Sequence, residues 1–142
     1  FGDLKIAGCW VHYRRKFHEA LEVIPKDLRK QSVLYLIMNQ VRAIYREEGN
    51  LSGLSSDERT ARRQLVVKPL VDAFFAYLKQ NSDRVPKSGK TKEAFTYALN
   101  QERYLRVFLE NGDVPMDNNA SERAIRGFCI GKNYVPNLVM GS

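Results

Sequence analysis

The residues best suited to chemistry lie near the C-terminal end, in the run Asp117-Asn118-Asn119-Ala120-Ser121-Glu122-Arg123-Ala124-Ile125-Arg126. Side-chain oxygens of this kind bind Mg²⁺, and arginine neutralises phosphate charge. Helix structure accounts for the same residues: Asn119 and Glu122 have the spacing of a capping box, and Glu122 and Arg126 that of an i,i+4 ion pair. The residues alone leave open whether Glu122 binds a metal or caps a helix.

Cys9 and His12 stand three residues apart and would supply half the ligands of a zinc site. A closed structural zinc site needs four ligands. The remaining candidates are Cys129 and His18, and His18 lies on a different helix face from His12. Taken alone, the pattern therefore favours a small core cysteine and a boundary histidine over zinc.

Two basic runs, Arg14-Arg15-Lys16 and Arg62-Arg63, could lie along a phosphate backbone. The formal net charge is +7, and the excess falls in residues 1–100, because residues 101–142 are neutral overall. Solvated helix faces have the same composition. Charge alone therefore leaves a polyanion-binding surface and a solvated surface as equal alternatives.

The segment Ser88-Gly89-Lys90-Thr91 is similar to the end of a phosphate-binding loop. The full pattern needs a glycine five residues before Gly89, where this chain has Arg84. We therefore predict no nucleotide site and interpret Thr91 as a helix cap.

The composition is that of one globular domain: 142 residues, 44% hydrophobic and 27% charged. Its apolar stretches are shorter than the ~20 residues of a membrane span, and no secretion signal is visible, so no membrane partner is expected. Two cysteines fit a reducing cytosol. The chain lacks an initiator methionine, and we expect it to be a piece of a longer protein.

Apolar periodicity predicts a mainly α fold. The predicted helices cover residues 9–24, 27–48, 57–81 and 91–110, followed by a short helix at 119–127. Ser56 or Asp57 should cap the third helix, and Pro69 should kink or break it. The only strand candidates lie at the two ends, around residues 4–6 and 134–139, so the two ends should belong to a sheet that is largely absent.

Several motifs together resemble one family of bacterial insertion-sequence transposases, the insertion sequence sixty-six family. Gly8-Cys9-Trp10-Val11-His12-Tyr13-Arg14-Arg15-Lys16-Phe17 is similar to its Gly-Cys-Trp-x-His-x-Arg-Arg-x-Phe motif. Tyr97-Ala98-Leu99-Asn100-Gln101 resembles a later helix, residues 117–126 resemble its closing signature, and Gly131-Lys132-Asn133-Tyr134 resembles the segment after it. The motifs follow the family order over nearly the whole chain, and residues 25–85 match loosely.

The resemblance implies a ribonuclease-H-like catalytic core with two aspartates and one glutamate. Glu122 matches the glutamate, both as a catalytic residue and as a Mg²⁺ ligand, and the aspartates would precede Phe1. Residues 9–115 would be a helical inserted region, and residues 116–142 the Glu-bearing helix and tail of the core. Cys9 and His12 become expected active-site neighbours. We expect Mg²⁺ in the complete enzyme, and a chain that is inactive alone because both aspartates are missing.

The expected partner is DNA, at the transposon ends and the target. The residues expected to contact it are Arg14, Arg15, Lys16, Arg123, Arg126 and Lys132. A homodimer and a place in the bacterial cytoplasm, associated with the nucleoid, are further expectations. The alternative is a non-catalytic helical module for DNA binding or assembly. A helical transcription regulator is disfavoured because the first basic helix carries aromatic residues typical of a core.

Overall fold

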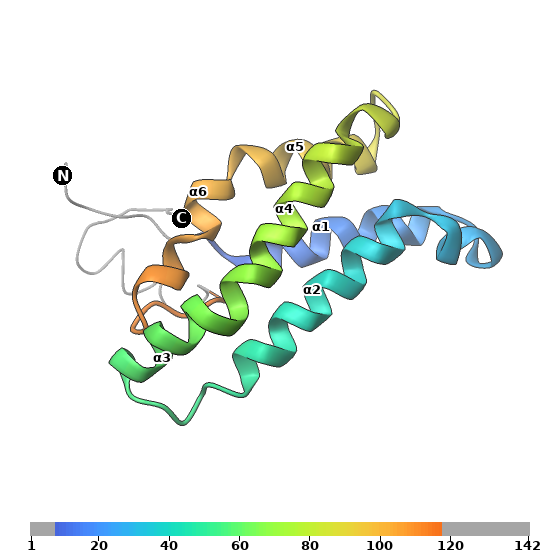
Figure 1. Cartoon of the computed structure of the whole chain (residues 1–142). Coiled ribbons are helices and arrows are strands. Elements are labelled where there is room, and N and C mark those ends of the chain that lie inside the picture. The colour runs from blue at the N-terminus through green and yellow to red at the C-terminus, as the bar shows by residue number, and fades with distance from the viewer. Residues whose placement is uncertain (1–7, 118–142) are drawn as a thin grey trace.

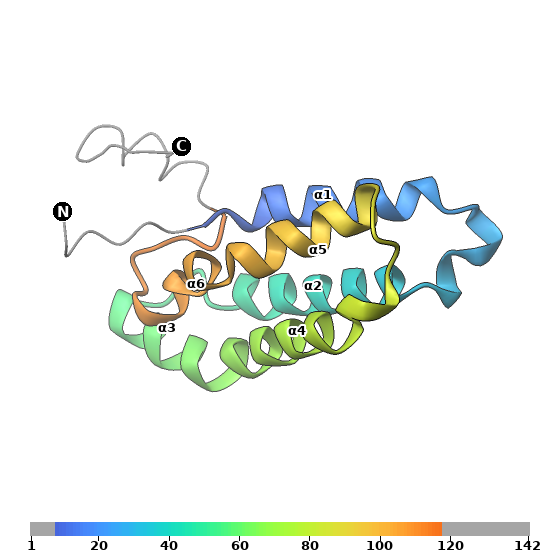
Figure 2. The ribbon, with the colours of Figure 1, turned by 90° about the horizontal axis from the view of Figure 1, so that it is seen from above.

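Four helices pack side by side with alternating directions in the computed structural model, which describes residues 8–117 (Figures 1 and 2). They are α1 (Trp10–Val23), α2 (Val33–Gly49), α4 (Lys68–Asn81) and α5 (Lys90–Asn100). Both α1 and α4 pack against α2 and against α5, which closes the four into a bundle. The predicted mainly helical fold is confirmed.

Shorter segments connect the bundle helices. They are a 3-10 segment at Lys26–Gln31, α3 (Ser56–Arg62), a π-helical turn at Arg63–Val67, a 3-10 turn at Ser82–Arg84, α6 (Glu102–Leu105) and a 3-10 segment at Val107–Glu110. Residues 8–117 contain no strand. The predicted helix at 119–127 and both strand candidates lie outside the described residues. Within the described range, no helix is both long and apolar enough to cross a membrane.

The second helix begins later than the sequence predicted. Residues Lys26–Gln31 form a 3-10 segment with no buried side chain, so no apolar stripe supports an α-helix there. Ser32 then caps α2, because its Oγ accepts a hydrogen bond from the backbone N–H of Leu34 at 3.0 Å.

The third helix is capped by Ser55, and the predicted caps Ser56 and Asp57 were wrong. The Oγ of Ser55 accepts from the backbone N–H of Glu58 at 3.2 Å, and Glu58 Oε1 accepts from the Ser55 backbone N–H at 3.1 Å. This reciprocal pair is a capping box, which neither of the next two residues completes.

Pro69 does not break the helix that runs from α3 into α4. The turn before it is π-helical, and the Lys68 backbone N–H donates to the carbonyl of Arg63, one residue further back than in an α-helix. Pro69 then occupies the first turn of α4, where a backbone N–H would have no partner within α4, so the missing N–H of proline costs no hydrogen bond. The widened turn replaces the predicted kink.

The predicted helix at 91–110 is divided. α5 ends where Gln101 leaves the helical region, and α6 and a 3-10 segment follow. The change of direction places Leu105, Phe108 and Leu109 in the core. The N-cap of α5 is Gly89, so the interpretation of Thr91 as the cap was wrong.

Trp10 lies at the centre of the core, fully buried. Its indole Nε1 donates to the carbonyl of Leu105 at 2.9 Å. Four aromatic rings surround it, with centroids within 6.3 Å of the indole centroid, namely those of Tyr13, Phe74, Phe75 and Phe108. The motif tryptophan thus joins α1 to α4 and to the segment after α5.

The two ends of the described chain meet at one end of the bundle. The backbone N–H of Gly8 donates to the carbonyl of Tyr104 at 2.8 Å, and that of Trp10 to the carbonyl of Met116 at 3.4 Å. A Cβ on Gly8 would lie 3.0 Å from Leu105 Cδ2 and 3.1 Å from the Leu105 backbone nitrogen, so a larger residue would require Leu105 to shift by a few tenths of an ångström. Four alternating passes return the chain to where it began (Figure 2).

The hydroxyl of Tyr13 yields a stability prediction. The side chain is fully buried, and the hydroxyl has no hydrogen-bond partner among the described residues. Removing an unsatisfied buried polar group is neutral or favourable, so Tyr13→Phe should leave the free energy of unfolding unchanged or raise it by up to about 1 kcal/mol. Urea titration measures it.

Trp10→Phe is the control for Tyr13→Phe, because it removes a buried donor whose partner stays behind. It should lower the free energy of unfolding by about 2 kcal/mol or more. A comparable loss in Tyr13→Phe would show that the tyrosine hydroxyl does contribute a native interaction.

Candidate active site

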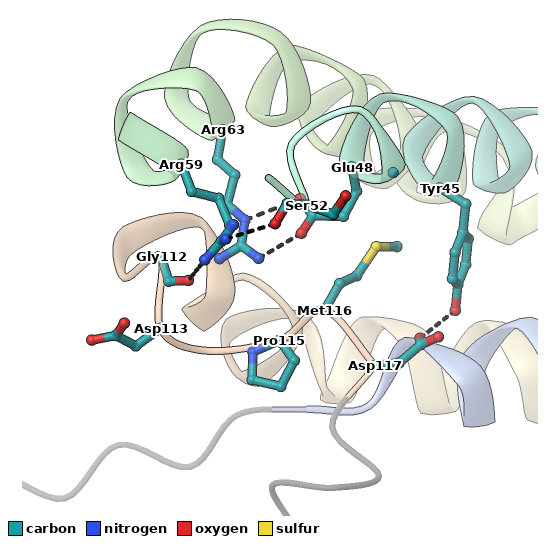
Figure 3. A pocket seen from close by; sticks show the side chains of 11 residues that line it. Tyr45, Glu48, Ser52, Arg59, Arg63, Gly112, Asp113, Pro115, Met116 and Asp117 are labelled. Carbon is teal, nitrogen blue, oxygen red and sulfur yellow. Dashed lines mark hydrogen bonds and ion pairs between the residues drawn. The ribbon is translucent and has the colours of Figure 1, made fainter. Parts of the chain in front are cut away.

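A buried arginine organises the end of the bundle where the chain ends meet. Arg63 is 1% exposed. Its Nε and Nη2 donate to the two carboxylate oxygens of Glu48 at 3.0 and 2.5 Å. Its Nη1 faces the carbonyls of Phe108, Asn111 and Val114 at 2.7, 3.1 and 2.9 Å. The guanidinium therefore joins α2, the α3–α4 helix and the segment that precedes the closing signature (Figure 3).

Neither sequence interpretation of Arg63 was right. The residue is neither solvated nor available to a phosphate, because its guanidinium is buried and its donors are engaged within the protein. Its neighbour Arg62 is exposed. Adjacent positions on a helix point in different directions, so one of two consecutive arginines faces the core.

Arg59, one turn before Arg63, holds the neighbouring loop. Its Nη1 donates to the Gly112 carbonyl at 2.8 Å. Its other nitrogens donate to the carbonyls of Leu51, Ser52 and Leu54 at 3.1, 3.2 and 2.6 Å. One side chain thus ties the loop after α2 to the segment after residue 110 (Figure 3).

Gly112 is where that segment touches α3. Its backbone N–H donates to Thr60 Oγ1 at 2.8 Å. A Cβ at this position would lie 2.1 Å from the carbonyl oxygen of Ser56, so any side chain would push the backbones apart. The close approach requires glycine and brings the segment within reach of Arg59.

Tyr45 and Asp117 join α2 to the first residue of the closing signature. The Tyr45 hydroxyl and Asp117 Oδ1 are 2.5 Å apart (Figure 3). Burial, and then the hydrogen bond to Asp117, raise the pKa of Tyr45 well above its usual range, so the phenol stays protonated and donates. The guanidinium carbon of Arg14 lies 4.6 Å from the Tyr45 ring centroid. These contacts fix Asp117 beside α1.

The structure places Cys9 and His12 at the N-terminal end of α1, on either side of Trp10, whose backbone N–H bonds the carbonyl of Met116. Cys9 is the N-cap residue and is 5% exposed, and His12 is half-buried. Residues 8–117 contain no group of three or more His, Cys, Asp or Glu side chains that could hold a metal. Described residues therefore complete neither a zinc nor a magnesium site around this pair.

The three basic residues of α1 leave the helix in different directions. Arg14 and Arg15 are exposed and line a groove between α1 and α2. Lys16 is half-buried, with its Nζ 5.0 Å from the ring centroid of Tyr97 on α5. The run therefore divides between two faces of the bundle.

Sequence reasoning missed Tyr45, Glu48 and Arg59 as site residues, and it singled out Arg63 only as part of a basic run. Their bonds join residues that are up to 72 positions apart, and no local spacing signals such pairs. The remaining predicted site residues, Glu122, Arg123, Arg126 and Lys132, lie outside the described residues.

Comparison with known proteins assigns the family. The family described as "Transposase IS66 family" matches residues 2–138. The chain therefore belongs to the IS66 family of transposases, as its motifs predicted. No solved structure matches it.

The relatives it matches are longer proteins. It is 29% identical over 136 residues to "Uncharacterized protein y4hP" of Sinorhizobium fredii, covering 91% of this chain and 25% of the relative. It is 32% identical over 126 residues to "Uncharacterized protein y4qI" of the same organism, covering 87% and 22%. The chain spans about a quarter of the length of these curated relatives.

The Arg63 cluster predicts a large loss of stability for a modest change. Arg63→Lys keeps the charge but loses the planar fork that bonds Glu48 and the carbonyls, so the free energy of unfolding should fall by about 3 kcal/mol. Arg62→Lys, at the exposed neighbouring position, should change it by less than about 0.5 kcal/mol. Equal effects in urea titrations would show that Arg63 has no special role.

Tyr45 and Asp117 should be energetically coupled. Tyr45→Phe and Asp117→Ala each remove one partner of this hydrogen bond, so each should lower the free energy of unfolding by about 1 kcal/mol, and the double variant should lose less than the sum. Urea titration of the four proteins gives the coupling energy. Tyr35→Phe changes a half-buried tyrosine on the same helix and is the control, which should show no coupling to Asp117→Ala. Additive losses for Tyr45→Phe and Asp117→Ala would contradict a direct bond.

Proposed function

We propose that this chain is the C-terminal part of the catalytic region of a DNA transposase, which cleaves phosphodiester bonds and transfers strands at transposon ends. Glu122 is the carboxylate it contributes to a site completed by two aspartates from the longer protein. The chain alone is inactive, because one carboxylate does not hold the metal ions. Family membership supports the transposase class.

The meeting of the two chain ends is the observation that carries the proposal. Trp10 of the first motif bonds Met116, next to the first residue of the closing signature. Asp117 is then fixed by Tyr45. A helical region whose ends lie together can be inserted into another domain without disturbing it. This supports reading residues 9–115 as an insertion in a ribonuclease-H-like core that resumes at residue 116.

The described residues do not by themselves fit a magnesium ion. They offer no cluster of three candidate ligands, and Asp117 Oδ1 is engaged by Tyr45. The proposal therefore assigns Mg²⁺ to Glu122 and the two aspartates of the complete enzyme. Bound there, Mg²⁺ would stabilise negative charge on the attacking and leaving oxygens.

The described side chains serve this chemistry by positioning. The buried guanidinium of Arg63 and the fork of Arg59 fix residues 108–114 against the bundle. Glu122 follows Asp117 by five residues, so a rigid Asp117 limits where the glutamate can lie. Cys9 and His12 flank Trp10, whose backbone bonds Met116, and remain candidates for contact with the reacting strand.

A non-catalytic module for DNA binding or assembly is the second candidate function. The groove between α1 and α2 favours DNA binding, because its arginine side chains suit phosphate. Such binding would not require the two aspartates of the longer protein. The two functions are compatible within one longer protein. A variant that loses DNA cleavage but retains DNA binding would distinguish the catalytic function from the binding function.

Substitution of Glu122 tests the catalytic assignment. In the complete transposase, Glu122→Gln removes an anionic ligand but stays nearly isosteric, so strand cleavage with Mg²⁺ should fall by orders of magnitude while the fold is retained. A glutamine can still serve in a capping box, so a purely capping role predicts near-normal cleavage and a loss of at most about 1 kcal/mol in stability. Gel assays on labelled transposon ends measure cleavage.

Glu93→Gln is the matched control. Glu93 is an exposed carboxylate in the first turn of α5, so its substitution changes the charge equally and should leave cleavage unchanged. Near-normal cleavage by a folded Glu122→Gln transposase would reject the catalytic role and leave the helix cap as the function of Glu122.

A further inference from the structure

A groove between α1 and α2 is lined by cationic side chains from both helices. α1 contributes Val11, Arg14, Arg15 and His18, and α2 contributes Met38 and Arg42. Val11 and Met38 are the less exposed members, whereas the three arginines and the histidine are exposed. The lining contains no carboxylate. The groove is therefore a concentrated positive surface over a small apolar base.

The arginines of this groove lack the ion pairs that other arginines of the fold form. Within residues 8–117, no carboxylate pairs with Arg14, Arg15 or Arg42. Arg42 donates to the neutral amide of Asn39, and Arg14 lies over the Tyr45 ring. Three like charges gathered without a counter-charge repel one another, and an anionic ligand would relieve that repulsion.

Arginines outside the groove are paired with acceptors inside the protein. Arg63 pairs with Glu48, and Arg106 pairs with both Asp72 and Glu102. Arg59 is engaged by four backbone carbonyls. The fold thus supplies carboxylates or backbone carbonyls for its structural arginines, whereas Arg42 of the groove donates only to the neutral amide of Asn39 and Arg14 lies over the Tyr45 ring.

The groove starts beside the candidate active site. Val11 follows Trp10, whose backbone bonds Met116, and Arg14 contacts the Tyr45 ring whose hydroxyl bonds Asp117. From Val11 to His18 the groove follows α1 for about 10 Å, because an α-helix rises about 1.5 Å per residue. Measured along a duplex axis, that length spans about three phosphates of one DNA strand, at a rise of about 3.4 Å per step.

We propose that this groove binds the phosphate backbone of the DNA strand that leads away from the catalytic end, with Arg42 of α2 as a phosphate contact facing Arg14 and Arg15 of α1. The inference rests on the proposed function and adds a binding surface, and a residue outside the family motifs, to it. Guanidinium forks suit phosphate oxygens, and the apolar base formed by Val11 and Met38 suits sugar faces. Such contacts read no sequence, so binding should tolerate any duplex.

The test is the salt dependence of DNA binding by the 142-residue chain. A short labelled DNA duplex of arbitrary sequence is titrated at several salt concentrations. Arg42→Gln should weaken binding and reduce the slope of log affinity against log salt by about 0.9, the contribution of one phosphate contact. Arg62→Gln removes the same charge from an exposed position on α3, outside the groove, and should leave the slope at the wild-type value.

Two results would overturn the proposal. One is a slope for Arg42→Gln equal to that of the wild type or of Arg62→Gln, with thermal midpoints showing that all three proteins are folded. The other is displacement of the duplex by polyglutamate at equal charge concentration, which would assign the groove to an acidic protein partner.

The outcome is separable from that of the proposed function. Binding is measured on this chain without metal, whereas Glu122→Gln is scored by cleavage in the complete transposase. If Arg42→Gln leaves the salt slope unchanged while Glu122→Gln abolishes cleavage, only the groove proposal is rejected. If Arg42→Gln reduces the salt slope as expected while the Glu122→Gln enzyme still cleaves, only the catalytic assignment of Glu122 is rejected.

Discussion

The buried guanidinium of Arg63 is the constraint on which the end of the bundle where the two chain ends meet depends. A fully buried charge is tolerated only when it is paired and hydrogen-bonded. Arg63 meets that condition by drawing Glu48 of α2 and the carbonyls of residues 108–114 to one point. The end of α2, the turn that carries Arg63 and residues 108–114 are thereby fixed together, because moving any of them would leave part of the guanidinium without a partner.

The position of Asp117, the first residue of the closing signature, follows from this arrangement. Once residues 108–114 are held, Met116 reaches the backbone of Trp10 and Asp117 reaches Tyr45. Gly112 allows the necessary close contact with α3, where a side chain would collide with the backbone. An even number of alternating helices then brings the start and the end of the described chain together, as an inserted region requires.

Positive charge serves two separate purposes in this fold. Arg59, Arg63 and Arg106 are structural, because carboxylates or carbonyls within the chain engage them. Arg14, Arg15 and Arg42 form a groove without a carboxylate. The net charge of +7 is the difference between 23 basic and 16 acidic residues, so it does not distinguish the two kinds of arginine. The distinction depends on burial and on which acceptors lie nearby.

The sequence by itself determined the family, the mainly helical class and the apolar stripes that carry Trp10, Phe17 and Ile44 into the core, because helical periodicity is a local property. It did not determine the break after α5, the wide turn before Pro69 or the cap at Ser55, where competing local options have similar energies. Only the tertiary structure decided that Arg63 is buried while Arg62 is exposed, and that Arg42 joins Arg14. Those outcomes depend on partners far away in the chain, and residue spacing carries no information about such partners.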